Sequence, residues 1–208
     1  MTPRDIENMF TRADGDYAFA RWGRGIAPIV FGVDDATLEV VKGAVEAVAR
    51  LARLEVVETD VELGANLMFF FFRDWDELRA VPDLGELVPD LPDLVARLQA
   101  ADANQYRGFR FDDAGAIKMC FVFLRMDAAL GAMAAEDLAL SQVVQTVLLW
   151  SQDAFGEKSP LAVLPDNDAT VLRPEIANLI HAAYDPVLPV AAVDNSHALR
   201  LFGRMPRE

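Results

Sequence analysis

The chain has 208 residues, a length that favours one domain over two. Hydrophobic residues make up 53% of it, and Gly and Pro occupy only 12 and 11 positions, which excludes a disordered or collagen-like chain. The formal net charge of −14 would repel phosphate backbones and anionic membranes, so we expect no nucleic-acid partner.

Cysteine content and apolar runs bear on redox chemistry and location. The single cysteine, Cys120, excludes an intramolecular disulfide and a multi-cysteine zinc site, and its apolar neighbours predict a core position. The apolar run at residues 67–72 is far shorter than the ~20 residues that cross a bilayer, so we expect no membrane insertion. No secretory signal is visible after Met1. We therefore expect a cytoplasmic protein, or a periplasmic or lipid-anchored one if a leader has been removed.

The first helix is predicted from its capping signals. Thr2 precedes Pro3, and Asp5 follows three residues after Thr2. This pattern is typical of a capped helix start, with proline at the first helical position. We expect a helix over residues 1–10 and an N-terminal helical arm that extends over residues 1–20.

A strand and an amphipathic helix are expected next. Residues 26–31 are apolar and predict a short strand, in which Pro28 lacks a backbone donor and therefore favours a sheet edge. Asp34 then provides a helix N-cap. Apolar side chains at spacings of three and four predict that this helix packs on a sheet through one stripe: Leu38, Val41, Val45, Val48 and Ala52.

Four further segments have the patterns of strands. Residues 56–62 alternate between β-branched and acidic side chains, which predicts a half-exposed strand, and residues 67–72 are apolar throughout, which predicts a central one. A turn then connects residues 106–112 and 117–126 into a hairpin. Its first strand carries arginines and suits a sheet edge, whereas the second is apolar on both faces and belongs inside the sheet.

The remaining segments are predicted to be helical or irregular. Residues 74–102 are interrupted by prolines and form an acidic insertion that covers one end of the sheet, with one short helix at 91–98. Long helices are expected at residues 134–152 and 174–184. Residues 190–208 are expected to form a C-terminal tail.

This order of elements predicts a single α+β domain over residues 1–208. Its sheet would be mixed and mostly parallel, with an antiparallel edge strand, and would be covered by helices. The stretch from Glu55 to Asp102 holds 12 acidic and 3 basic residues. We interpret it as a solvated acidic surface, with a partner-binding patch as the alternative.

A narrow polar stripe interrupts the apolar helix expected at 134–152. Ser141 and Gln145 are four residues apart, Gln142 and Gln145 are three apart, and Gln152 lies further along the same side. Buried polar groups must find hydrogen-bond partners. The stripe therefore either faces water and structural polar groups or is a remodelled active site.

The sequence from Ser141 to Gln145 stands where a zincin metallopeptidase carries its His-Glu-x-x-His motif, on a long helix that follows an edge strand and an inner strand. Residues 139–150 and the segment around Tyr184, Asp185 and Pro186 also resemble an uncharacterised proteobacterial family. Many members of that family are described as lipoproteins, and we associate it with the zincin-like superfamily. The resemblance implies a zincin-like fold.

The resemblance also implies that the peptidase chemistry is missing. The two zinc-ligand positions fall on Ser141 and Gln145, and the general-base position falls on Gln142. A neutral amide cannot deprotonate water, and Ser and Gln do not replace two imidazoles around Zn²⁺. We therefore expect no metal, no cofactor and no zincin-type catalysis. This expectation favours a protein that is not an enzyme.

Both histidines have ordinary alternatives to a functional role. His181 could reach the polar stripe together with Tyr184, or could interact with the carbonyls at its helix end. His197 follows Asp194 and Ser196, but residues so close in sequence do not form a catalytic triad, so we expect a turn or helix cap there.

The favoured hypothesis is a non-catalytic, zincin-like domain that binds a peptide or protein partner. Its candidate site residues are Ser141, Gln142, Gln145, His181 and Tyr184. One alternative is a hydrolase whose active site uses His181, Tyr184 and an acid from the insertion. The other is an acidic chaperone or antagonist of a basic partner.

Overall fold

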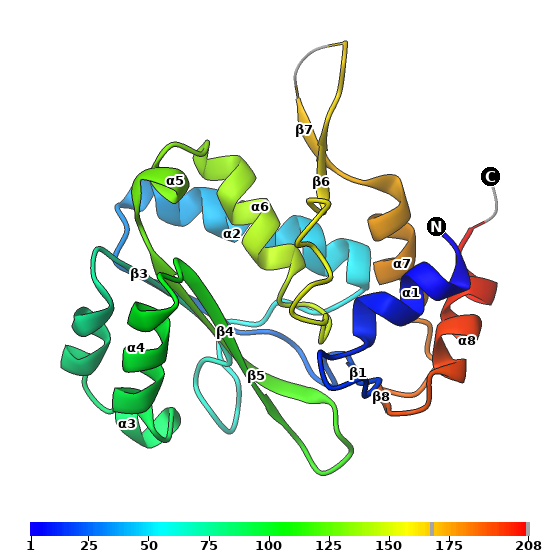
Figure 1. The fold of residues 1–208 in the computed structure, drawn as a ribbon, viewed down its shortest axis with the longest axis horizontal. Helices are drawn as coiled ribbons and strands as arrows, with labels where there is room; N and C mark the ends of the chain where they lie inside the picture. Colours follow the sequence, from blue (N-terminus) through cyan, green and yellow to red (C-terminus); the bar gives the residue numbers. More distant parts are fainter. Residues whose placement is uncertain (167–168, 207–208) are drawn as a thin grey trace.

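A four-stranded sheet lies at the centre of the computed structural model, which describes residues 1–166 and 169–206 (Figure 1). The order of its strands is β2-β3-β5-β4, and β2, β3 and β5 are parallel whereas β4 is an antiparallel edge. This confirms the predicted mixed sheet with an antiparallel edge strand. The strands are β2 (Pro28–Phe31), β3 (Leu67–Phe72), β4 (Gln105–Phe111) and β5 (Ile117–Arg125).

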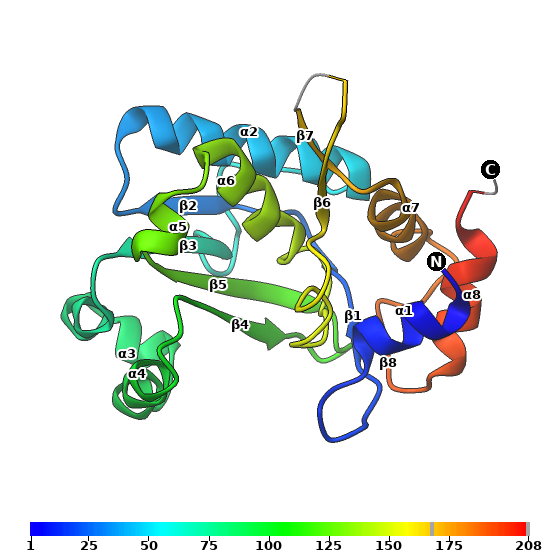
Figure 2. The same cartoon turned by 45° about the horizontal axis from the view of Figure 1, so that its top comes forward.

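Helices α2 (Asp35–Ala52) and α6 (Ala135–Val144) cover one face of the sheet (Figure 2). The predicted stripe of α2 forms its inner side, where Val41, Val45 and Val48 are buried. Cys120 on β5 lies in the same core, as expected, and burial raises the pKa of its thiol. Helix α7 (Pro174–Ala183) packs beside α2.

The predicted insertion covers the second face of the sheet. It forms the 3-10 helix η1 (Trp75–Ala80) and the helices α3 (Leu84–Leu87) and α4 (Leu91–Ala100). Phe70 and Phe72 pack in this second core, whereas Phe69 packs in the first. The alternation of side chains along a strand explains why β3 is apolar throughout. Both cores share one sheet, so the described residues form a single domain.

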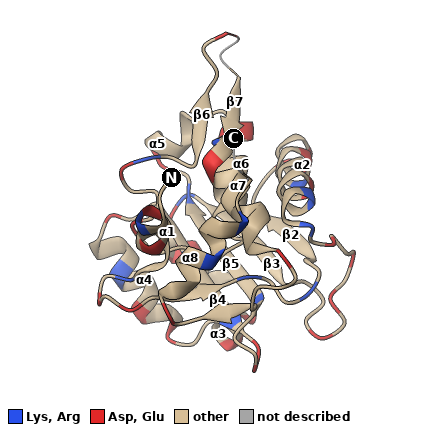
Figure 3. Ribbon diagram, turned by 90° about the vertical axis from the view of Figure 1, so that its right-hand side faces the viewer, with Lys and Arg blue, Asp and Glu red and all other residues tan. Residues whose placement is uncertain are grey.

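The acidic residues of this insertion point outward. Asp83, Glu86, Asp90 and Asp93 are exposed on α3, α4 and the turns before them. Figure 3 shows that acidic residues also occur on loops and helices elsewhere in the molecule.

The predicted strand at residues 56–62 is wrong, because this segment is a loop with isolated bridges only. Asp60 organises it by accepting hydrogen bonds from the backbone N–H groups of Glu62 and Leu63, each at 2.9 Å, and from the Asn66 side chain at 3.1 Å. Burial disfavours the ionised form of Asp60 and acts to raise its pKa. These hydrogen bonds favour the ionised form more strongly, so the pKa of the carboxyl is lowered. Side-chain capping of the turn therefore overrides the alternating pattern.

The two ends of the chain belong to the body of the fold. Helix α1 (Pro3–Phe10) starts with the predicted capping box at Thr2 and packs against α8 (Ser196–Arg204) (Figure 2). The short strands β1 (Phe19–Ala20) and β8 (Ala191–Ala192) pair antiparallel. The expected arm and tail are thus packed elements rather than extensions, and residues 207–208 of the expected tail lie outside the described residues.

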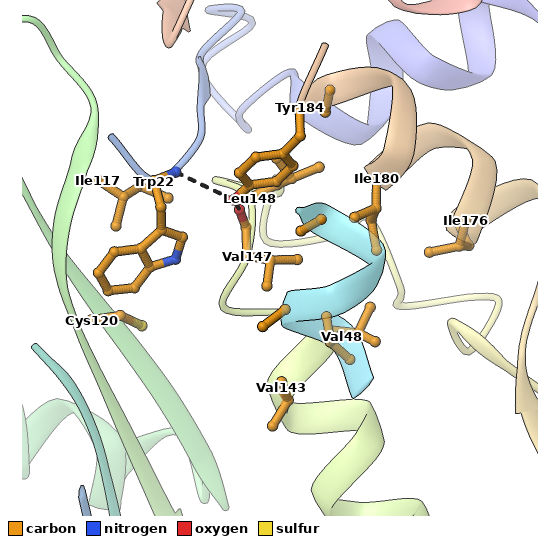
Figure 4. Packing of buried hydrophobic residues seen from close by; sticks show 14 of the residues in the cluster. Trp22, Val48, Ile117, Cys120, Val143, Val147, Leu148, Ile176, Ile180 and Tyr184 are labelled. Carbon is orange, nitrogen blue, oxygen red and sulfur yellow. Dashed lines mark hydrogen bonds between the residues drawn. The ribbon is translucent and has the colours of Figure 1, made fainter. Parts of the chain in front are cut away.

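The helix expected at 134–152 ends earlier, at Val144. Beyond it the backbone carbonyls bind other partners: the indole N–H of Trp22 donates to the Thr146 carbonyl at 2.8 Å, and the Tyr184 hydroxyl donates to the Val147 carbonyl at 2.5 Å. The Tyr184 oxygen also accepts the backbone N–H of Trp22, at 3.3 Å (Figure 4). These contacts compete with helical hydrogen bonds and turn the chain back over the sheet.

Three short elements complete the fold. They are helix α5 (Ala128–Gly131) and the hairpin of β6 (Leu161–Val163) and β7 (Thr170–Leu172). No helix within residues 1–166 and 169–206 is both long and apolar enough to span a membrane.

Candidate functional site

Two glutamines of the predicted polar stripe bind an arginine of the edge strand. Gln142 lies in the last turn of α6, and Gln145 is the residue after this helix. Arg107, in β4, donates from Nη1 to Gln142 Oε1 at 2.7 Å and from Nη2 to Gln145 Oε1 at 2.6 Å. The guanidinium therefore holds the edge strand against the C-terminal end of α6.

Two more polar side chains complete this cluster. Gln105 accepts hydrogen bonds from Arg107 Nη1 at 3.2 Å and from Gln142 Nε2 at 3.1 Å. Gln145 Nε2 donates to the backbone carbonyl of Ser141 at 3.1 Å and faces its hydroxyl at 3.4 Å. The stripe is thus a connected network, which we call the Arg107 cluster: Gln105, Arg107, Ser141, Gln142 and Gln145.

The positive charge of the Arg107 cluster is not neutralised by the surrounding protein. In the described part of the chain, Arg107 forms no ion pair with a carboxylate and binds only amide oxygens. Burial disfavours the charged guanidinium and lowers the pKa of Arg107 from its ordinary value. Arginine nevertheless keeps its proton in proteins. The cluster therefore presents a desolvated positive charge.

A cavity of about 320 Å³ opens beside the Arg107 cluster. Gln105, Arg107 and Gln145 form its polar side, and the apolar side chains of Phe109, Leu149 and Trp150 also line it. The volume lies at the lower end of the range of small-molecule sites. Tyr106, Ser151 and Gln152 complete the lining.

The Trp150 ring is held firmly in the cavity wall. It stacks on Phe10 of α1, with ring centroids 5.2 Å apart, and meets Phe155 edge-on at 5.0 Å. Its indole N–H donates to the Val144 carbonyl at 3.0 Å. The next residue, Ser151, donates its backbone N–H to Met9 at 2.7 Å. Helix α1 therefore supports this wall of the cavity.

The outer edge of β4 carries unpaired backbone groups. Asn104, just before β4, accepts the backbone N–H of Arg125 at 2.8 Å. Because the backbone groups of successive residues alternate in direction, the N–H and C=O groups of Arg107 and Phe109 point away from β5. Among the described residues, β4 pairs with β5 alone. On the outer edge, the Phe109 carbonyl accepts a hydrogen bond of 3.2 Å from Arg110 Nη1.

The other two predicted site residues lie away from the Arg107 cluster. The buried Tyr184 bridges Trp22 and Val147 within the core, and burial raises the pKa of its hydroxyl. His181, near the end of α7, is half-buried, with Nε2 at 3.1 Å from the guanidinium of Arg53. The structure therefore brings together Ser141, Gln142 and Gln145, but joins neither His181 nor Tyr184 to them.

His197 occupies the turn and helix start expected for it. Asp194 accepts the backbone N–H of Ser196 at 2.8 Å, just before α8 begins. The His197 ring is buried against Phe19, with ring centroids 4.4 Å apart. Neither ring nitrogen has a hydrogen-bond partner among residues 1–166 and 169–206.

The residues at the zincin motif positions do not fit a zinc ion. The side-chain oxygens of Gln142 and Gln145 are already bound to the Arg107 guanidinium. Neutral amide and hydroxyl oxygens are poor zinc ligands, and the guanidinium would repel a dication. Elsewhere in the described chain, no three His, Cys, Asp or Glu side chains form a group that could hold a metal ion.

Arg107 was not among the predicted site residues. The signal lies in the alternation along β4, where Arg107 shares a face with Phe109, which packs against the core. A charged residue on the inner face of a strand requires polar partners. The glutamine stripe provides them.

Comparisons with known proteins identify no relative of this chain: no protein-family model, no curated protein and no solved structure matches it.

Proposed function

We propose that this protein is a non-catalytic, zincin-like domain that binds an extended peptide in the cleft between β4 and the segment from α6 to Gln152. The observation that carries the proposal is the Arg107 cluster, beside a cavity and an unpaired strand edge. The resemblance assigns the zinc-ligand and general-base positions to Ser141, Gln145 and Gln142, and the oxygens of the two glutamines bind the Arg107 guanidinium. Such a site can bind a ligand but has no group to activate water.

The arrangement of elements supports the zincin-like part of the proposal. Three parallel strands with an antiparallel edge strand, covered by α2 and α6 on one face, follow the order that the resemblance implies. Helix α6 ends beside the edge strand, with Gln142 and Gln145 directed at it.

Strand addition is the binding mode that this edge favours. Extended peptides commonly bind by adding a strand to an exposed sheet edge, where backbone hydrogen bonds supply affinity and side-chain pockets supply specificity. The outward N–H groups of Arg107 and Phe109 and the outward carbonyl of Arg107 would provide the hydrogen bonds, whereas the Phe109 carbonyl is bound by Arg110. The cavity formed with Leu149 and Trp150 would provide the pocket.

A peptide pull-down tests the proposal. The full chain is immobilised and exposed to a synthetic pool of random decapeptides with free C-termini, and the retained peptides are identified by mass spectrometry. We expect the native chain to retain peptides and Gln145→Leu to retain about tenfold less, because the variant loses one amide that positions Arg107. Gln99→Leu, at an exposed position of α4 outside the lining of this cavity, is the matched control and should bind as the native chain does.

A methylation scan of the best-retained peptide then tests the binding mode. Methylation of a peptide nitrogen removes one backbone donor. Strand addition predicts that every second methylation abolishes binding, because alternate residues of an added strand face the partner strand. Failure of the native chain to retain any peptide would overturn the proposal, and a scan without alternation would overturn strand addition.

A further inference from the structure

The Arg107 guanidinium lines the cavity and has N–H donors that no described residue accepts. A guanidinium carries five N–H donors. Three hydrogen bonds join Arg107 to Gln105, Gln142 and Gln145, and within the described residues no partner takes the remaining two donors. Gln142 is buried, whereas Arg107 is partly exposed and lines the cavity, so a ligand in the cavity lies beside the guanidinium.

The missing partner of this guanidinium is an anion. Buried arginines are ordinarily paired with a carboxylate or phosphate, and the planar guanidinium matches a carboxylate with two parallel hydrogen bonds. The amide oxygens of the cluster fix the orientation of Arg107 but leave its charge uncompensated. A ligand carboxylate would supply that compensation.

The apolar wall of the cavity favours a ligand that carries an apolar side chain next to its carboxylate. Phe109, Leu149 and Trp150 line the same cavity of about 320 Å³ as Arg107. The last residue of a peptide carries both its carboxylate and its side chain on one Cα atom, so a single apolar C-terminal residue can satisfy Arg107 and this wall together. An Asp or Glu side chain would bring only methylene groups to the wall.

The direction of an added strand agrees with this placement. Antiparallel pairing is the more stable arrangement for adjacent strands. In a peptide that runs antiparallel to β4, the C-terminal end lies beside the start of β4, where Gln105 and Arg107 stand. The free carboxylate would then reach the Arg107 cluster while the preceding residues pair with the outer edge around Phe109.

We infer that the cleft recognises the free C-terminus of a peptide whose last residue is apolar, with Arg107 binding the terminal carboxylate and Phe109, Leu149 and Trp150 contacting the last side chain. This inference rests on the proposed function, because it assigns a ligand class to the same cleft. It makes Arg107 the residue that determines specificity.

The test compares two pools of random decapeptides that are identical except for the C-terminal group, one pool ending in the free acid and the other in the amide. Each pool is passed over the immobilised full chain, and the retained peptides are sequenced by mass spectrometry. We expect the acid pool to be retained about tenfold or more over the amide pool, since a charge-assisted hydrogen bond is lost in the amide. The retained acids should end in Leu, Ile, Val, Phe or Met.

Two arginine variants connect this preference to the site. Arg107→Gln should abolish the preference for the acid pool. Arg50→Gln removes the same charge from an exposed position of α2, outside the cavity lining and the edge of β4, so the preference should persist. If Arg107→Gln fails to fold, Arg107→Lys keeps the charge with fewer donors and should weaken the preference.

The outcomes separate this inference from the proposed function. Equal retention of the acid and amide pools would overturn C-terminal recognition while leaving peptide binding intact. Enrichment of internal Asp or Glu in both pools would overturn it in favour of side-chain carboxylates. Retention of neither pool would overturn both proposals.

Discussion

Arg107 donates a 2.7 Å hydrogen bond to the side-chain oxygen of Gln142, a residue 35 positions later in the chain. This bond joins the sheet edge to the helix that covers it, and Gln142 is 3% exposed. The Arg107 cluster is therefore a structural joint as well as a candidate binding site.

Replacing Arg107 by Leu should destabilise the fold by about 1–3 kcal/mol, because the buried Gln142 oxygen loses its strongest donor. The double variant Arg107→Leu, Gln142→Leu should recover part of this loss, since both partners then become apolar. The coupling between the two side chains is measured by urea unfolding of four proteins: the native chain, Arg107→Leu, Gln142→Leu and the double variant. Strictly additive effects would contradict the assigned contact.

Tyr184→Phe should lower the free energy of unfolding by about 1–3 kcal/mol, because the Val147 carbonyl loses its buried donor and the backbone N–H of Trp22 its acceptor. Tyr106→Phe is the matched control. Its half-buried hydroxyl forms no hydrogen bond with the described residues, so its effect should stay within about 0.5 kcal/mol. Equal losses in the two variants would argue against the bridging role of Tyr184.

Stability should fall as the pH drops from about 6.5 to 4. Burial and the nearby charge of Arg200 lower the pKa of His197 to about 4, whereas an unfolded histidine has a pKa near 6.5. Below pH 6.5 the unfolded chain therefore binds a proton that the folded chain does not. The difference amounts to about 2–3 kcal/mol.

The free energy of urea unfolding, measured at pH 7, 6, 5 and 4, tests this pH dependence. His197→Leu keeps an apolar contact for Phe19 and removes the titrating ring, so most of the slope above pH 4 should disappear. If the variant keeps the native slope, another group is responsible.

Peptide binding should change the fluorescence of one tryptophan. Trp150 lines the cavity and is half-buried, whereas Trp22 and Trp75 are 1% and 2% exposed. A peptide side chain against Trp150 should shift its emission to shorter wavelength, because it removes water from the ring. In Trp150→Phe, which can still stack on Phe10, the shift should vanish even when the peptide is added at saturation. A shift that survives in this variant would place the ligand elsewhere.

Regular periodicity made much of the fold predictable from the sequence. The stripe of α2, the apolar β3 and the β4–β5 hairpin each extend over enough residues for one pattern to dominate, and the Thr2 capping signal is local. The pattern at residues 56–62 was misleading because Asp60 and Asn66 fix that backbone through side-chain hydrogen bonds. The alternating pattern and the capping of the turn by Asp60 compete over the same few residues, and the alternation alone does not decide between them.

The candidate site was predicted only on its helical side. The spacing of Ser141, Gln142 and Gln145 predicted a shared polar stripe, and the structure confirms that they lie together. Their partner Arg107 comes from a strand that is distant in sequence, and no local pattern pairs the two. The helix end at Val144 was likewise set by Trp22 and Tyr184, which bind the following carbonyls from elsewhere in the chain.

Amide hydrogen exchange at the sheet edge tests the central claim most directly. The most strongly retained decapeptide is added at saturation, and exchange rates are measured by NMR for individual amides of β4. The N–H groups of Arg107 and Phe109 should exchange at least about tenfold more slowly, while those of Gly108 and Arg110, already directed at β5, should change little. Unchanged exchange at Arg107 and Phe109 in the saturated complex, or protection confined to β2, would contradict peptide binding at this edge.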